Sequence, residues 1–151
     1  MDFRTKVDNI SFAVRVSGLM IRDKTLYLVK SPKSEYYLLG GAVAVGETTE
    51  QAVKRELAEE IGVAVTVERL AFVVENHFTL NDVMHHQIEF LYLVTPLSEP
   101  NPVVMEGGTN RTCEWVAIND LDEINLNPSF LKTALKNWTG QLQHIFNREE
   151  N

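Results

Sequence analysis

The sequence predicts an α+β fold in which a mixed β-sheet carries one helix on each face, within a single layered domain of residues 1–151. Short apolar runs separated by polar turns recur along most of the chain, as in a sheet of several strands. Two segments, residues 49–61 and the stretch from residue 127, instead have apolar residues at helical spacing. The length of 151 residues is that of one domain with one substantial core.

The first predicted elements are strands. Residues 11–16 and 17–21 are extended, a polar turn follows at residues 22–24, and residues 25–30 form a second strand that closes a hairpin. A further turn at residues 31–35 leads to a short apolar strand at residues 36–39. This strand runs into the paired glycines Gly40 and Gly41, where a turn is expected.

The central helix has clear start and stop signals. Thr48, followed three residues later by Gln51, fits a capping box, and Gly62 stands where a left-handed residue commonly ends a helix. These signals predict a helix over residues 49–61. Its core-facing stripe consists of three apolar residues spaced four apart: Val53, Leu57 and Ile61.

Beyond this helix, residues 64–78 and 84–94 predict two long strands joined by a turn at Asn81 and Asp82. The second strand ends in an apolar run (residues 90–94), which indicates burial on both faces. A Pro- and Gly-rich loop covers residues 96–112, and residues 114–118 form a last short strand. A helix that starts at residues 127–129 has its apolar side chains on one side: Phe130, Leu131, Ala134, Leu135 and Trp138.

Charge and composition exclude several classes of partner. The formal net charge of −7 gives no electrostatic footprint for duplex nucleic acid or an anionic lipid surface. No apolar run approaches the roughly 18 residues of a membrane-spanning helix, and the first ten residues carry charges where a signal peptide would be apolar. Cys113 is the only cysteine, so no internal disulfide can form. We therefore expect a cytoplasmic protein.

Three glutamates near the end of the central helix predict a metal site. Glu56, Glu59 and Glu60 lie within one helical turn, so their carboxylates crowd together on one side of the helix. Like charges three or four residues apart repel by roughly 0.2–0.5 kcal/mol per pair, and a cation in front of them would remove that cost. Hard oxygen ligands suit Mg²⁺ or Mn²⁺ rather than zinc. Alone, an acidic helix face is usually only solvated surface.

The residues around these glutamates form a longer pattern. Gly41 is followed after five residues by Glu47, and after seven more by the run Arg55-Glu56-Leu57-x-Glu59-Glu60-x-Gly62-Val63. This pattern, residues 41–63, resembles the Nudix box at every fixed position. Residues 15–39, and the later segment 114–116 with Leu121, are similar to the opening and closing strands of Nudix hydrolases. The resemblance implies a Nudix-type α/β/α sandwich with a mixed sheet and the metal-dependent hydrolysis of a nucleoside diphosphate linked to another group, X.

Metal ligands follow from the resemblance, position by position. Glu56, Glu59 and Glu60 would hold Mg²⁺ or Mn²⁺ directly or through water, and Gly40 would add its backbone carbonyl. Three further positions of the box are expected to be structural: Gly41, Glu47 and Gly62.

Catalytic roles also follow from the resemblance. Arg55 would pair with an acidic neighbour, Glu47, and orient Glu56. The general base is left open between a glutamate of the box (Glu56 or Glu59) and Glu106 in the Pro- and Gly-rich loop, with Glu89 as a weaker candidate.

The substrate class has three alternatives. The first is a small nucleotide of the type NDP-X, cleaved to NMP and P-X. The second is a nucleoside triphosphate, and the third is a nucleotide-sensing domain that does not hydrolyse its ligand. The complete set of box glutamates speaks against the third, because a sensor does not need every ligand. By analogy with relatives that pair through sheet edges, a homodimer is also expected.

Overall fold

The computed structural model describes residues 1–104 and 111–149 of the chain. The elements in these residues are, in chain order, β1 (Arg4–Val7), β2 (Ile10–Arg22), β3 (Thr25–Lys30), β4 (Glu35–Tyr37), β5 (Leu39–Ala42), α1 (Thr49–Ile61), β6 (Val65–Leu80), β7 (Val83–Pro96), β8 (Thr112–Ala117), the 3₁₀ helix η1 (Ile118–Glu123), β9 (Asn125–Asn127), α2 (Leu131–Lys136) and β10 (Gln143–Glu149).

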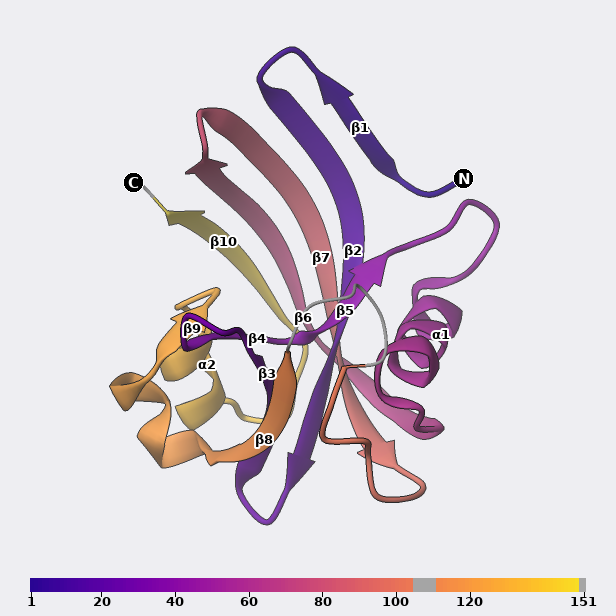
Figure 1. The fold of residues 1–151 in the computed structure, drawn as a ribbon, viewed down its shortest axis with the longest axis vertical. Coiled ribbons are helices and arrows are strands. Elements are labelled where there is room, and N and C mark those ends of the chain that lie inside the picture. Colours follow the sequence, from indigo (N-terminus) through magenta and orange to yellow (C-terminus); the bar gives the residue numbers. More distant parts are fainter. Residues whose placement is uncertain (105–110, 150–151) are drawn as a thin grey trace.

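The strands form one curled sheet in the order β10-β6-β7-β2-β3-β4-β9 (Figure 1). Strands β1 and β5 also pair with β2, and β8 pairs with β3. Three pairs are parallel (β10 with β6, β2 with β7, β4 with β9), and the pairs β1–β2, β2–β5 and β6–β7 are antiparallel. The predicted mixed sheet is therefore confirmed.

The two α-helices lie on opposite sides of this sheet, as predicted (Figure 1). Helix α1 packs on one face with Val16 and Met20 of β2, whereas α2 and η1 pack on the other face with Leu19 of the same strand. Strand β7 divides its side chains in the same way, since Leu91 belongs to the core beside α2 and Val94 to the core beside α1. Its predicted burial on both faces is thus confirmed.

Helix α1 has the predicted bounds, residues 49–61, because its caps form as the sequence indicates. The Thr48 side chain accepts from the backbone N–H of Gln51, and the Gln51 side chain accepts from the backbone N–H of Thr48. Gly62 adopts a left-handed conformation, with φ of 60°, and ends the helix. The apolar stripe is fully buried: Val53, Leu57 and Ile61.

The expected turn at Gly40 and Gly41 is wrong. The predicted strand at residues 36–39 is divided into β4, which pairs with β3 and β9, and β5, which pairs with β2. In β5, Gly40 lies opposite Ser17 and Gly41 lies opposite Val16. Both glycines therefore belong to a strand, because β2 supplies partners for their backbone.

The end of the chain also differs from prediction. Strand β8 is not the last, because β9 and β10 follow it, and β10 pairs in parallel with β6. The final helix is short and begins at Leu131, since Asn127 belongs to β9. Its apolar side chains, with the flanking Phe130 and Trp138, nevertheless pack together in the core beside η1. Neither helix in the described part of the chain has the length and apolar character that crossing a membrane requires.

Candidate active site

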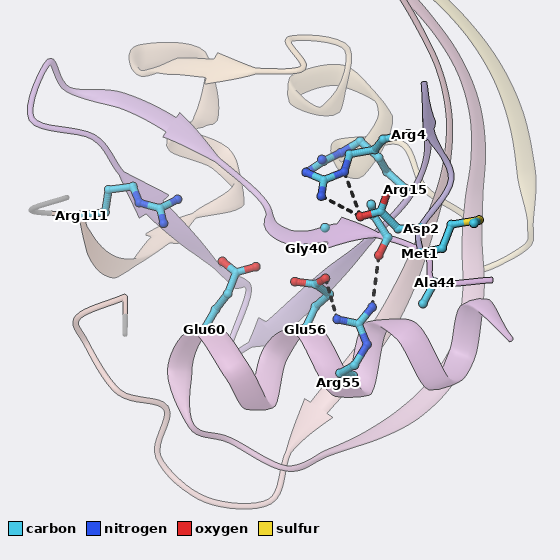
Figure 2. Close-up of a pocket in the computed structure, with 12 residues that line it drawn as sticks. Met1, Asp2, Arg4, Arg15, Gly40, Ala44, Arg55, Glu56, Glu60 and Arg111 are labelled. Carbon is cyan, nitrogen blue, oxygen red and sulfur yellow. Dashed lines mark hydrogen bonds and ion pairs between the residues drawn. The ribbon is translucent and has the colours of Figure 1, made fainter. Parts of the chain in front are cut away.

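A pocket of about 780 Å³ lies between α1, β5 and the first residues of the chain. Figure 2 shows Glu56 and Glu60 rising from α1 into this pocket, with Arg111 on one side and Arg4 and Arg15 on the other. The volume is that of a small-molecule site. The carboxylate helix predicted from the sequence therefore does not simply face solvent.

Neighbouring atoms leave no space for a side chain at either glycine of β5. A Cβ atom on Gly41 would lie 2.4 Å from the carboxylate carbon of Glu56, far inside normal contact. A Cβ atom on Gly40 would lie 2.0 Å from the backbone carbonyl oxygen of Val16. Close approach, rather than a turn, therefore explains the glycine pair.

Glu60 is the most buried carboxylate of the pocket, with 8% of its surface exposed. This burial, together with the nearby charge of Glu56, raises the pKa of Glu60 to about 7. Arg111, a backbone hydrogen bond from Gly40 and the charge of Arg15 act in the opposite direction. Near neutral pH the side chain is therefore poised between its two protonation states.

Arg55 connects the start of α1 to the pocket. Its Nη2 and Nε atoms donate to the two carboxylate oxygens of Glu47 at 2.6 and 3.1 Å, and its Nη1 donates to Glu56 at 2.9 Å. Nη2 also donates to the backbone carbonyl of Ala42 at 3.1 Å. These bonds to Glu47 and Glu56 raise the pKa of Arg55, and the bond from Arg55 holds the pKa of Glu47 below its ordinary value. The expected Arg55–Glu47 pair is present, and Arg55 also bonds Glu56.

Glu59 lies apart from the other two glutamates of the helix. Its carboxylate accepts from Arg55 Nη1 at 3.2 Å, its side chain is 41% exposed, and it does not line the pocket. Within residues 1–104 and 111–149, no group of three or more His, Cys, Asp or Glu side chains is gathered closely enough to hold a metal ion. The structure thus brings together Glu56 and Glu60 of the predicted ligands. Glu106, the loop candidate for the base, lies outside the described residues.

The pocket nevertheless fits a divalent cation. Glu56 and Glu60 present only carboxylate oxygens, and their mutual repulsion contributes to the raised pKa of Glu60. A hard cation between them would remove that repulsion and take the oxygen ligands that Mg²⁺ prefers. Gly40 also lines the pocket, so its backbone lies near the same space. Glu59 would have to leave Arg55 to join these ligands.

Three arginines of the pocket were missed by sequence reasoning: Arg4, Arg15 and Arg111. They come from β1, β2 and the residue before β8, so no local spacing connects them. Arg15 alone has a sequence signal, because it is a charged residue within the otherwise mostly apolar strand β2. A charged residue inside a mostly apolar strand is unusual and indicates that its side chain has a partner or a functional role.

A second cavity, of about 500 Å³, lies against β6 and β7, and Arg15 lines both cavities. Its wall includes the buried Asn76 and Glu89. Asn76 donates to Glu89 at 3.5 Å and accepts from Asn147 at 2.8 Å. Burial raises the pKa of Glu89, while the charge of Arg15 and the hydrogen bond from Asn76 lower it. Tyr37 and Phe78 add aromatic surface to this cavity. Glu89, the weaker candidate for the base, thus lines the second cavity and not the first pocket, which contains Glu56 and Glu60 and is called the carboxylate pocket below.

Comparison with known families identifies a domain shared with other proteins. The model of the NUDIX domain matches residues 11–137. An ADP-ribose pyrophosphatase from Methanocaldococcus jannaschii is 28% identical over 116 residues, which are 74% of this chain and 66% of that protein. The matched region therefore spans just under two thirds of this relative.

Solved structures show the same architecture. The MutT NUDIX hydrolase from Burkholderia pseudomallei is 30% identical, with a TM-score of 0.59 over 72% of this chain and 84% of that one. The MutT protein from Bacillus halodurans is 18% identical, with a TM-score of 0.73 over 89% of each chain. The second likeness, at low identity, supports the fold alone. Together these structures confirm the α/β/α sandwich expected from the sequence.

Proposed function

The chain belongs to the NUDIX domain family, and from this membership we propose that it is a divalent-metal-dependent hydrolase of nucleoside diphosphate derivatives. It would cleave NDP-X to NMP and P-X, within a single domain and in the cytoplasm. The observation that carries the proposal is the position of Glu56, which Arg55 holds at 2.9 Å beside Glu60 in a pocket large enough for a diphosphate.

The reaction is the addition of water across a phosphoanhydride. A water oxygen bonds to one phosphorus, the bond from that phosphorus to the bridging oxygen breaks, and the departing phosphate keeps the bridging oxygen. One proton of the water goes to a base. A diphosphate resists this attack because its own charge repels an incoming hydroxide, so catalysis rests on neutralising and aligning the phosphates.

Glu56 and Glu60 would hold the cation, with Glu59 and the Gly40 carbonyl as further ligands. Bound Mg²⁺ or Mn²⁺ supplies charge neutralisation and acidifies a water. Arg55 keeps Glu56 in position through its hydrogen bonds to Glu47 and Ala42. A displacement of a catalytic group by about 1 Å can lower the reaction rate roughly 10²-fold. The hydrogen bonds that fix Glu56 would therefore contribute to catalysis.

The water proton would pass to a glutamate. Glu56 is one candidate, because it faces the pocket and is already fixed by Arg55. Glu106 is the other, and substitution of each residue separates the two.

The second cavity would receive the nucleoside. Arg15 lines both cavities, so a nucleotide could lie with its phosphates beside Glu56 and its base against Tyr37 or Phe78. Stacking on Tyr37 and Phe78 would hold any base. The polar wall formed by Asn76 and Glu89 would then distinguish one base from another through hydrogen bonds.

One assay tests the proposal. The protein is incubated with ADP-ribose, NADH, dinucleoside polyphosphates and a set of nucleoside triphosphates, each with and without Mg²⁺. Release of a nucleoside monophosphate only in the presence of Mg²⁺ is the expected result. ADP-ribose belongs in the panel because of the relative from Methanocaldococcus jannaschii, and the triphosphates test the second substrate class. Binding of these compounds without hydrolysis would contradict the proposal and favour a sensor.

A further inference from the structure

We propose that Arg4 selects substrates in which the group X itself bears a phosphate. This inference rests on the proposed hydrolysis and names the chemical class of X, which includes the terminal phosphate of a nucleoside triphosphate. It depends on a segment that the family model, which begins at residue 11, does not cover.

The first residues of the chain form one wall of the carboxylate pocket. β1 pairs with β2, with Arg4 opposite Ala13, and the residues before β1 pair with the segment that follows β5, where Asp2 lies opposite Ala44. The backbone N–H of Phe3 donates to the Val43 carbonyl at 3.0 Å, and that of Val45 donates to the Met1 carbonyl at 2.9 Å. This pairing fixes the backbone on both sides of Asp2, so Arg4 enters the pocket from an ordered strand (Figure 2).

The present partner of Arg4 is easily replaced. Asp2, two residues away, accepts from the guanidinium at 2.7 and 2.9 Å, and 66% of the Arg4 side chain is exposed. Exposed ion pairs of this kind contribute little to stability. Asp2 and, less strongly, Glu56 raise the pKa of Arg4, so the guanidinium lies within electrostatic reach of the Glu56 carboxylate. A phosphate beside Glu56 could therefore take the place of Asp2.

The distribution of positive charge indicates an additional phosphate. A divalent ion held by Glu56 and Glu60 would contact the diphosphate of NDP-X, and Arg55 is already occupied by Glu47 and Glu56. Within the described residues, no hydrogen bond or ion pair engages the Arg15 guanidinium, which lines both cavities and can serve the phosphate next to the nucleoside. Arg111 lies on the other side of Glu56 and Glu60 (Figure 2), so Arg4 is left for a group X bound on its own side of the pocket. A neutral X would give it no anion, whereas a phosphate would accept two charge-assisted hydrogen bonds.

Calorimetry, which measures binding and not hydrolysis, tests this assignment. With Mg²⁺ present, inorganic tripolyphosphate should bind the native protein about 10-fold more tightly than pyrophosphate, as expected for one added charge-assisted contact. In Arg4→Gln this ratio should fall to about 2-fold or less. The matched control is Lys6→Gln, which removes the same charge from the same exposed strand without lining either cavity, and should keep the native ratio. An unchanged ratio in Arg4→Gln would overturn the assignment.

Kinetics provides a second readout. The ratio of kcat/KM for nucleoside triphosphates to kcat/KM for ADP-ribose should fall about 10-fold in Arg4→Gln and recover in part in Arg4→Lys, which keeps the charge. Asp2→Asn, which frees Arg4, should raise the same ratio. If the native protein hydrolyses the panel but these ratios do not move, the inference is wrong and the proposed function stands. If nothing is hydrolysed while the tripolyphosphate ratio behaves as expected, the proposed function fails and the anion site remains.

Discussion

Glu60→Gln should remove a pH-dependent loss of stability from the metal-free protein. The pKa of Glu60 rises from its ordinary value of 4.5 to about 7 in the folded chain, first because of burial and second because of the charge of Glu56. Between these two values the folded protein keeps a proton that the unfolded chain has already released. Stability must therefore fall as pH rises through this window and level off above it.

The magnitude follows from the same shift. Each pKa unit corresponds to about 1.4 kcal/mol, so the full window amounts to roughly 3 kcal/mol. The pocket is open to water on one side, and screening reduces the expected effect to about 2 kcal/mol. A Gln at position 60 carries no charge at any pH, so the variant should be more stable than the native chain above neutral pH and show a shallower slope.

The measurement is urea unfolding in the presence of a chelator, at about pH 5 and about pH 8, where the low-pH titrations of Glu47 and Glu99 are complete. The change between the two pH values is compared for the native protein and Glu60→Gln, so that contributions from Glu89 and His77, which both proteins share, cancel. Glu50→Gln is the matched control, since Glu50 is an exposed residue of the same helix. Equal pH dependence in the native protein and Glu60→Gln would refute this account.

Three further substitutions probe the site. Gly41→Ala should lower kcat by roughly 10²-fold while the protein stays folded, because the new methyl carbon would lie 2.4 Å from the carboxylate carbon of Glu56 and would displace it. Steady-state kinetics checks the rate, and a thermal melt checks that the variant is folded. Arg55→Lys should lower kcat about 10-fold or more, since a single ammonium cannot bond both oxygens of Glu47 and also reach Glu56. Near-native kinetics would show that the multiple hydrogen bonds of the guanidinium are not needed for activity. Glu106→Gln should lower kcat by roughly 10²-fold if Glu106 is the base, with Mg²⁺ affinity retained, whereas a near-native rate would assign that role to the box.

Much of the fold could be predicted because its signals are local. The bounds of α1 agree residue for residue with the prediction, since the capping box, the apolar stripe and Gly62 all lie within or next to the helix. The β6–β7 hairpin was predicted for the same reason, with Asn81 and Asp82 at positive φ in its turn. In contrast, β10 escaped prediction, because its half-polar sequence becomes a strand only beside β6, about 70 residues earlier in the chain.

The helix that carries the three glutamates was visible in the sequence because seven fixed positions of one pattern lie within residues 41–63. Spacing on a helix determines which residues share a side, so the proximity of Glu56 and Glu60 required no tertiary information. The role of Gly41 did require it. Only the packing of β5 against α1 shows that a side chain at this position would occupy the place of the Glu56 carboxylate.

The sequence by itself determined the family, the helix that carries the carboxylates and the class of chemistry, since each depends on residues close together in the chain. Only the tertiary structure decided what surrounds those carboxylates. Arg4, Arg15 and Arg111 reach one pocket from separate elements, and Glu59 turns toward Arg55 instead of the pocket. Such convergence arises from strand pairing across long stretches of chain, and no spacing in the sequence encodes it.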